Sequence, residues 1–329
     1  MRFRISPLWW PILALASPVL IPMLWVRNQK FRQDINRADR ENRRRLASAR
    51  HMDLPAHDQL DLTVLLDDMA LDGFRTAPGI SYLLSTGEKS LLFDMGFGDE
   101  NGAFAHNIAA AEPDFDRTAA VVISHLHPDH MGGFAAVKQR AVPLPKGCKD
   151  LEGLPCYLPD ACQARPFEAR QVVGPQLLPA GIGTTGPLDC SLFFMGPTRE
   201  QVLLVRLKDK GVVVVTGCGH PTIALILENV ARLTPEPVYA VVGGLHLPVT
   251  DSPWKKPGLQ VQMIFGTGKP PWQRISDRDV DEAVTALNQA RVKYLYLSSH
   301  DICAHAIRRL SHEMDGEAVC LESGKTYTL

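Results

Sequence analysis

The chain has 329 residues, of which 45% are hydrophobic and 22% are charged, a composition typical of a globular protein rather than a disordered or fibrous one. Its formal net charge of -1 hides an asymmetry: residues 1–50 are rich in lysine and arginine, whereas residues 51–329 carry an excess of aspartate and glutamate. Nucleic acid is therefore not expected as a partner, because phosphate contacts need clustered basic side chains.

The seven cysteines are scattered along the chain without a CxxC pair, which excludes a zinc knuckle and a disulfide framework. Cys148, Cys156 and Cys162 are close enough in sequence for one loop bridge in an oxidising compartment.

Residues 7–26, PLWWPILALASPVLIPMLWV, contain no charged residue. A helix of this length spans the ~30 Å hydrocarbon core of a bilayer, and tryptophans lie near both of its ends, where indole rings favour the interface. We therefore predict that residues 1–26 form an N-terminal transmembrane anchor or an uncleaved signal. The alternative is a cleaved signal peptide, with Arg2 and Arg4 as its basic start and a small-residue site after Ala16.

Residues 27–58 are predicted to form a basic juxtamembrane linker or a polar helix. Nine basic residues lie between Arg27 and Arg50, and basic residues prefer the cytoplasmic side of a membrane. The pattern favours a single-pass protein of a bacterial-type inner membrane with its body in the cytoplasm. A periplasmic or exported body is the alternative.

Residues 59–329 read as one α/β domain. Strands are expected at short β-branched runs, with a hairpin around Thr86–Glu88, and helices at the amphipathic segments 222–233 and 277–291. The region 143–186 is rich in turn residues and is expected to be loop, and SLFFMG, residues 191–196, is expected to be a strand. The pattern predicts two β-sheets packed face to face with helices outside.

Six of the 11 histidines follow apolar strands, where the loops of an α/β body converge. These six are His125, His127, His130, His220, His246 and His300. The other five lie in linker or helical contexts and are interpreted as structural: His51, His57, His106, His305 and His312.

The stretch SHLHPDHMGG contains the spacing His125-x-His127-x-Asp129-His130 directly after a predicted strand. Because residues i and i+2 of an extended segment point the same way, His125 and His127 can hold one metal ion. The turn that follows directs Asp129 and His130 towards a second. Imidazole and carboxylate ligands suit zinc, with iron or manganese as alternatives.

With this motif the chain resembles the metallo-β-lactamase superfamily, whose signature is HxHxDH. The resemblance implies a four-layer αβ/βα sandwich over residues 59–329 and a site that holds two zinc ions. It also implies that Asp94, in LLFDMG, orients a metal-binding histidine by hydrogen bonding.

Later motifs resemble the subgroup that includes dihydropterin-phosphate synthase-like proteins. In TGCGHPT, Cys218 stands where relatives carry a bridging aspartate, so the resemblance makes His220 the third ligand of the His125 and His127 metal. Cys218 is a supporting residue or a thiolate ligand, and a small buried cysteine is the alternative. In SSHDICAH, His300 joins Asp129 and His130, with Asp301 and Cys303 in support.

The chemistry implied is metal-dependent hydrolysis, in which a metal-bound hydroxide attacks an ester-type substrate such as a phosphoester or lactone. Asp129 would steer the proton of the nucleophile, and His246 would protonate the leaving group, with a purely structural role for His246 as the alternative. Residues 251–274 form either a lid or an ordinary surface excursion. As a lid they would bring Trp254, Trp272 and lysines (Lys255, Lys256, Lys269) to a small, anionic substrate. The alternatives are a non-hydrolytic pterin-pathway synthase, a di-iron redox enzyme and a metal-binding protein without turnover.

Overall fold

The structure is a computed structural model, and it describes residues 4–253, 255–256 and 258–329. The expectations placed on Arg2, on Trp254 and on the side chains of Lys255 and Lys256 fall outside the described part of the chain.

One sheet is built mainly from the first half of the chain, and its seven strands follow the order β17-β2-β3-β4-β5-β6-β7. The strands from β2 to β4 pair antiparallel, and those from β4 to β7 pair parallel. Their bounds are β2 (Asp61–Leu66), β3 (Ser81–Ser85), β4 (Ser90–Phe93), β5 (Thr118–Val122), β6 (Pro155–Leu158), β7 (Glu168–Gln171) and β17 (Thr326–Thr328). The last strand of the chain thus closes the edge of the first sheet.

The second sheet has the order β16-β15-β12-β11-β10-β9-β8, with β1 beside β10. Strands β8 to β11 pair antiparallel, and β11, β12, β15 and β16 pair parallel. Their bounds are β1 (Ala56–His57), β8 (Gln176–Leu177), β9 (Gly183–Leu192), β10 (Gly196–Leu207), β11 (Gly211–Val215), β12 (Val238–Gly243), β15 (Tyr294–Leu297) and β16 (Glu317–Cys320). A small hairpin, β13 (Lys255–Lys256) and β14 (Leu259–Gln260), lies apart from both sheets.

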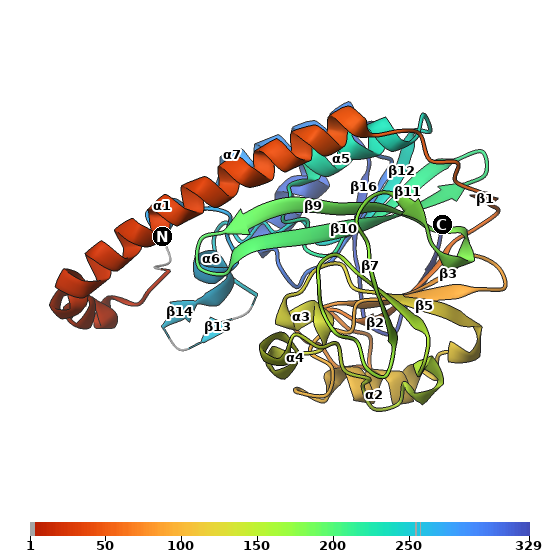
Figure 1. The fold of residues 1–329 in the computed structure, drawn as a ribbon, viewed down its shortest axis with the longest axis horizontal. Helices are drawn as coiled ribbons and strands as arrows, with labels where there is room; N and C mark the ends of the chain where they lie inside the picture. The colour runs from red at the N-terminus through yellow and green to blue at the C-terminus, as the bar shows by residue number, and fades with distance from the viewer. Residues whose placement is uncertain (1–3, 254, 257) are drawn as a thin grey trace.

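The two sheets pack face to face, and each is covered by helices on its outer face (Figure 1). Successive residues of a strand point to opposite faces, so Val213 and Val215 of β11 enter the core between the sheets. Val212 and Val214 enter a separate core beneath the helices. A third core lies under the helices of the first sheet. Helices, sheet, sheet and helices thus form four layers with a core between each pair of neighbouring layers, which is the arrangement expected from the sequence.

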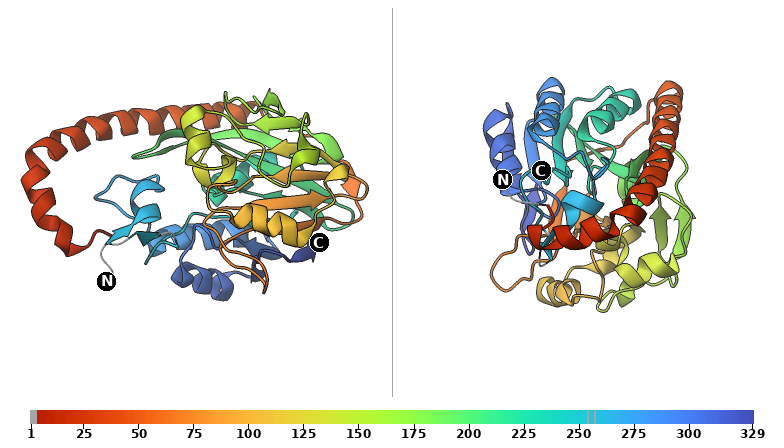
Figure 2. Two further views of the ribbon diagram at one scale, coloured as in Figure 1. Left: turned by 90° about the horizontal axis from the view of Figure 1, so that it is seen from below. Right: turned by 90° about the vertical axis from the view of Figure 1, so that its left-hand side faces the viewer.

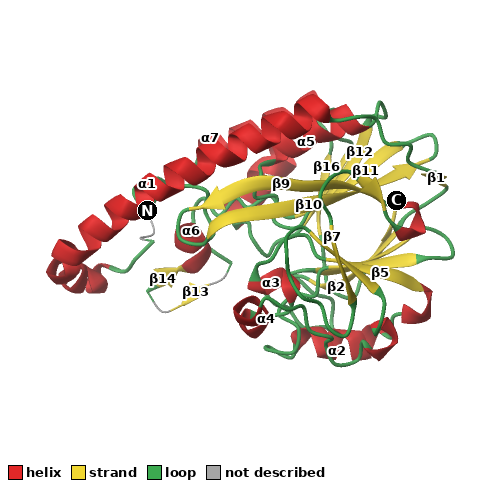
Figure 3. Ribbon diagram, in the orientation of Figure 1, coloured by secondary structure: helices red, strands yellow, loops and turns green. Residues whose placement is uncertain are grey.

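Helices α5 (Ile223–Leu233), α7 (Asp277–Gln289) and α8 (Ala304–Glu313) cover the second sheet. Helix α7 begins with a capping box in which Ser276 and Asp279 satisfy each other's backbone N–H groups. Helices α2 (Ala103–Ala111), α3 (Pro128–Met131) and α4 (Phe134–Gln139) cover the first sheet. Figure 3 shows the two helical layers outside the strands.

Helix α1 (Trp10–Ser48) is a single long helix that includes most of the apolar segment and most of the basic segment. Its C-terminal half packs along β9, whereas its N-terminal half projects from the body (Figure 2). Leu15 and Val19 are 86% and 72% exposed. By length and composition it is the one helix in the described part of the chain that could cross a membrane, and a signal sequence would pass the same test.

The strand and helix positions agree with the expectations except in two places. The region 143–186 is not all loop, because β6, β7, β8 and the start of β9 lie within it. SLFFMG is not a strand of its own, because residues 193–195 form the tight turn of the β9–β10 hairpin. All seven cysteines are free thiols, so Cys148, Cys156 and Cys162 form no bridge in this structure.

Candidate metal centre

Three histidines from two segments meet at one end of the sheets. His125 and His127 lie in the loop after β5, and His220 lies in the loop between β11 and α5. One ring nitrogen of each lies within 4.8 Å of the others, and Nε2 of His220 is 3.2 Å from Nδ1 of His127. These are the three residues expected to share one metal ion.

A second group lies beside the first and consists of Asp129, His130, Cys218 and His300. Nε2 of His130 lies 3.0 Å from Sγ of Cys218, which is itself 3.2 Å from Nε2 of His300. Asp129 and His130 come from α3, and His300 follows β15. The expected companions of the second metal are therefore adjacent, and the thiol of Cys218 lies among them.

His246 extends the cluster on the side of His220, since these two residues and Cys218 form a third group of neighbouring ligand atoms. Its backbone has a left-handed φ of 50°, and Oδ2 of Asp301 accepts the backbone N–H of His246 at 2.9 Å. Cys303 is the N-cap residue of α8 and donates its backbone N–H to the carbonyl of Leu247. Asp301 and Cys303 therefore fix the loop that presents His246.

Asp94, which the resemblance implies would orient a metal-binding histidine, contacts His130 in the structure. Its Oδ2 lies 2.7 Å from Nδ1 of His130, so Nε2 of the ring faces Cys218. The same carboxylate accepts the backbone N–H of Ser124 at 2.7 Å and its hydroxyl at 2.6 Å. The Ser124 hydroxyl in turn lies 2.9 Å from Nδ1 of His125, so one buried carboxylate supports residues of both groups.

Glu200 is a buried carboxylate that the sequence analysis did not single out. Its Oε1 accepts the backbone N–H groups of Gly217 and Gly219, and its Oε2 accepts that of His220 at 2.9 Å. It thereby holds the whole loop that carries Cys218 and His220. In the sequence Glu200 is one of two charged residues in the polar stretch TREQ, and its distance from the histidine motifs gives no sign of this role.

The electrostatic environment keeps most of these histidines neutral. Burial lowers the pKa of His127 to about 3 and that of His246 to about 4. Burial and neighbouring rings also hold the pKa values of His125, His220 and His300 well below 6.5. For His130 burial acts in the same direction, but the carboxylates of Asp129 and Asp94 raise its pKa to about 9. Neutral imidazole is the form that binds metal.

Two further observations indicate that these side chains are suited to bind a metal ion. Nε2 of His125 and both ring nitrogens of His246 are buried and have no hydrogen-bond partner in the described residues. Unpaired buried polar atoms are rare and call for an explanation such as an ion. Nitrogen, sulfur and carboxylate oxygen donors together suit zinc and neighbouring transition metals.

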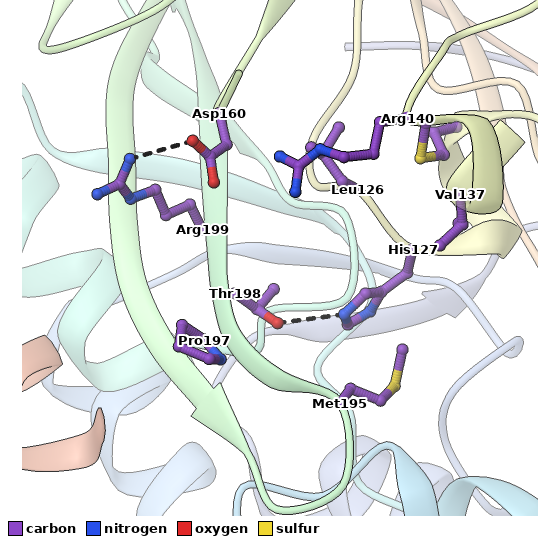
Figure 4. A pocket seen from close by; sticks show the side chains of 10 residues that line it. Leu126, His127, Val137, Arg140, Asp160, Met195, Pro197, Thr198 and Arg199 are labelled. Atoms are coloured by element: carbon purple, nitrogen blue, oxygen red, sulfur yellow. Dashed lines mark hydrogen bonds and ion pairs between the residues drawn. The ribbon is translucent and has the colours of Figure 1, made fainter. Parts of the chain in front are cut away.

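Two pockets flank the cluster. The smaller, about 190 Å³, is lined by His127, Arg140 and Arg199, and the side chains of both arginines lie near Asp160 (Figure 4). There the hydroxyl of Thr198 lies 3.2 Å from Nε2 of His127, and Arg199 pairs with Asp160 at 3.3 Å. The larger pocket, about 330 Å³, is lined by His220 and His246 on the other side.

The segment expected to form a lid packs against the site. Within it, α6 (Val261–Phe265) lies close to the cluster, since Nε2 of Gln262 donates to the carbonyl of His300 at 2.6 Å. The Cα of Gly266 faces His246 so closely that an added Cβ would lie 2.8 Å from its ring. Lys269 is paired with Asp279 rather than directed at an anion.

Residues 76–228 match the family model described as the metallo-beta-lactamase superfamily. The structure is similar to that of Tm1679, a metal-dependent hydrolase of the beta-lactamase superfamily, with a TM-score of 0.59 and 22% identity over 82% of this chain and 98% of that chain. YhfI from Bacillus subtilis, a metallo-beta-lactamase fold protein, scores 0.49 at 17% identity over 83% of this chain and 100% of that chain. The short form of human tRNase Z scores 0.47 at 14% identity over 81% and 98%. A search of curated proteins gives no significant match.

The two mixed sheets with outer helices have the metallo-β-lactamase fold, and the histidine-rich site lies largely within the segment that matches the superfamily model. The match over residues 76–228 agrees with the superfamily expected from the HxHxDH motif, whereas the resemblance to one subgroup is not supported by these matches.

Proposed function

We propose that the protein is a metal-dependent hydrolase of an ester-type substrate, such as a phosphoester or lactone. The observation that carries this proposal is the meeting of six histidines, one aspartate and one cysteine, from segments up to 175 residues apart, at the junction of two pockets. The metal-dependent hydrolase that shares this fold supports it.

His125, His127 and His220 would hold one ion, and Asp129, His130 and His300 a second, with zinc the metal that suits these donors best. Metal ions bound there supply Lewis acidity, which lowers the pKa of water and stabilises charge on an oxygen of the substrate. Cys218 would be a ligand of the second ion, in place of a carboxylate.

The remaining chemistry belongs to three further side chains. The carboxylate of Asp129 lies beside His130, with Oδ2 3.6 Å from Nε2, and would accept the proton of the nucleophile. His246 lines the larger pocket, neither of its ring nitrogens has a hydrogen-bond partner in the described residues, and its N–H would assist the leaving group. Arg140 would bind an anionic part of the substrate in the smaller pocket.

The test compares wild type with His127→Ala, both purified and loaded with zinc. We expect two ions per chain and turnover of chromogenic phosphodiesters, lactones or carboxylic esters in the wild type. The variant should lose metal and activity while keeping its circular dichroism spectrum. A metal-replete His127→Ala protein with wild-type turnover would refute the site. Two iron ions and a redox-active spectrum in the native protein would favour a redox enzyme instead.

We propose further that the N-terminal half of α1 anchors the protein in a membrane with the body in the cytoplasm. The exposed apolar residues of α1 and the basic residues that follow them support this arrangement. Extraction of membranes with alkaline carbonate tests the anchor, and N-terminal sequencing tests cleavage after Ala16. Release into the soluble fraction as a shortened chain would favour an exported protein.

A further inference from the structure

The wall of the larger pocket comes partly from the N-terminal helix. Ile35 and Ala38 of α1 face Ala224 and Leu225 of α5 across a space of about 330 Å³, and His220 and His246 also line this space. This volume lies in the range of small-molecule sites. The helix proposed as an anchor is thus also part of the site proposed to be catalytic.

Helix α1 is held in this position by specific contacts. The side-chain amide of Asn42 donates to the carbonyl of Asp189 at 2.7 Å, and its oxygen accepts the backbone N–H of Asp189 at 2.8 Å. Phe31 packs edge-on against Phe193, with ring centroids 5.2 Å apart. The wall is therefore fixed on β9 and is not a loosely associated helix.

One face of α1 connects the pocket with the exposed apolar segment. Apolar residues on this face recur at the three- or four-residue spacing of a helix stripe and are buried or half-buried: Leu20, Leu24, Phe31, Ile35 and Ala38. Asn28 and two charged residues are half-buried on the same side of the helix: Arg27 pairs with Asp34 at 4.0 Å and donates through its guanidinium to the backbone carbonyls of Leu192 and Phe193. Apart from this polar group, apolar side chains continue from residue 20 to the pocket.

The charges around the pocket disfavour an anionic group inside it. Asp39, Asp189, Asp279 and Glu282 line it, and the one lysine there, Lys269, is paired with Asp279. The rest of the lining contains the two histidines, a few small polar side chains and several aliphatic ones: Ile223, Leu225, Leu245, Leu247 and Ile275. Burial of alkyl groups against such side chains is favourable, at about 0.8 kcal/mol per CH₂.

We propose that this pocket binds the apolar chain of an amphiphilic ester, with the bond to be cleaved beside His220 and His246. This inference rests on the hydrolase function proposed above and specifies its substrate class. Helix α1 then has two roles, since its first half would lie in a membrane and its second half forms the site for an alkyl chain. The substrate would reach the site from the membrane along the apolar face of α1.

The binding test uses the full chain in phospholipid nanodiscs and a dodecanoate ester that carries a photoreactive diazirine at the end of its chain. We expect cross-links to residues that line the pocket, mapped by mass spectrometry. Ala224→Trp should fill the pocket and reduce these cross-links at least tenfold. Ala231→Trp is the matched control, because Ala231 lies two turns further along α5, is exposed and does not line the pocket. Ala38→Trp repeats the test from α1.

Cross-links confined to residues 7–26, or equal pocket labelling in Ala224→Trp and wild type, would overturn the proposal. Turnover of p-nitrophenyl acetate and dodecanoate separates this failure from failure of the hydrolase function. The proposal expects a higher kcat/KM for the longer ester in the wild type, and a loss of that preference in Ala224→Trp. Equal turnover of both esters would refute the chain-binding pocket alone, whereas pocket labelling without any turnover would refute the hydrolase alone.

Discussion

Sγ of Cys218 lies 3.0 Å from Nε2 of His130. Burial raises the pKa of this thiol well above its usual value in the metal-free protein, so a metal ion must displace its proton in order to bind there. We expect the cobalt-substituted protein to show a near-ultraviolet thiolate-to-cobalt charge-transfer band, which Cys218→Ser removes together with part of the metal. Cys162→Ser, on the far side of the first sheet, should leave the spectrum unchanged. A band that persists in Cys218→Ser would show that the thiol is not a ligand.

Glu200 should be important for both stability and metal affinity, because its carboxylate accepts three backbone N–H groups of the loop from Gly217 to His220. In Glu200→Gln the side-chain amide group would oppose one of these N–H groups, donor against donor. A buried unsatisfied group costs about 1–3 kcal/mol. We expect a loss of this size in the free energy of unfolding by urea, together with weaker metal binding.

The control is Glu228→Gln, which changes an exposed carboxylate on α5 whose nearest basic group is 3.8 Å away. Exposed ion pairs of this kind contribute little, so the unfolding midpoint should not move. If Glu200→Gln matched this control in stability and metal content, the carboxylate would have no role in holding the loop.

Gly266→Ala should displace His246 without disturbing the fold. Gly266 has a φ of -81°, which alanine adopts without strain, but its Cβ would lie 2.8 Å from Cε1 of His246. Misplacement of a reacting group by about 1 Å can cost roughly a hundredfold in rate. We expect a fall in kcat with unchanged metal content and thermal stability. Gly174→Ala, where no atom lies within 4 Å of the added Cβ, should behave as wild type, and equal activity of the two variants would argue against a role for His246.

Asp67 should make the stability of the metal-free protein depend on pH. Burial raises the pKa of this carboxyl to about 7, although Tyr82 and Ser299 donate hydrogen bonds to it. Between about pH 4 and pH 7 the folded chain therefore holds a proton that the unfolded chain has lost, and the free energy of unfolding falls as pH rises. One such proton contributes up to about 1.4 kcal/mol per pH unit.

Asp67→Asn mimics the protonated acid, because its Oδ1 can still accept and its amide can donate to the hydroxyl of Tyr82. Urea unfolding at several pH values in the presence of a chelator should show a shallower decline for this variant. An unchanged slope would mean that Asp67 is ionised throughout the range.

The sequence predicted those parts of the protein that have a local signal. The apolar runs of β10, β11 and β12 mark their strands, and the HxHxDH spacing predicted a cluster that the fold brings together. Strand β7 was missed because all four of its residues are exposed, so that it has no alternation of apolar and polar side chains. Glu200 was missed because its role depends on a loop almost twenty residues further along the chain. The wall provided by α1 was also missed, since among many charges only Phe31, Ala38 and Asn42 are buried.

The pairing of β17 with β2 has a consequence for folding. Thr326 to Thr328 complete the edge of the first sheet, and Leu329 exchanges backbone hydrogen bonds with Leu60. Contacts between residues so distant in sequence slow folding, because a long loop of chain must close before they can form. The first sheet is therefore expected to be completed late, when the two segments that flank most of the α/β body come together.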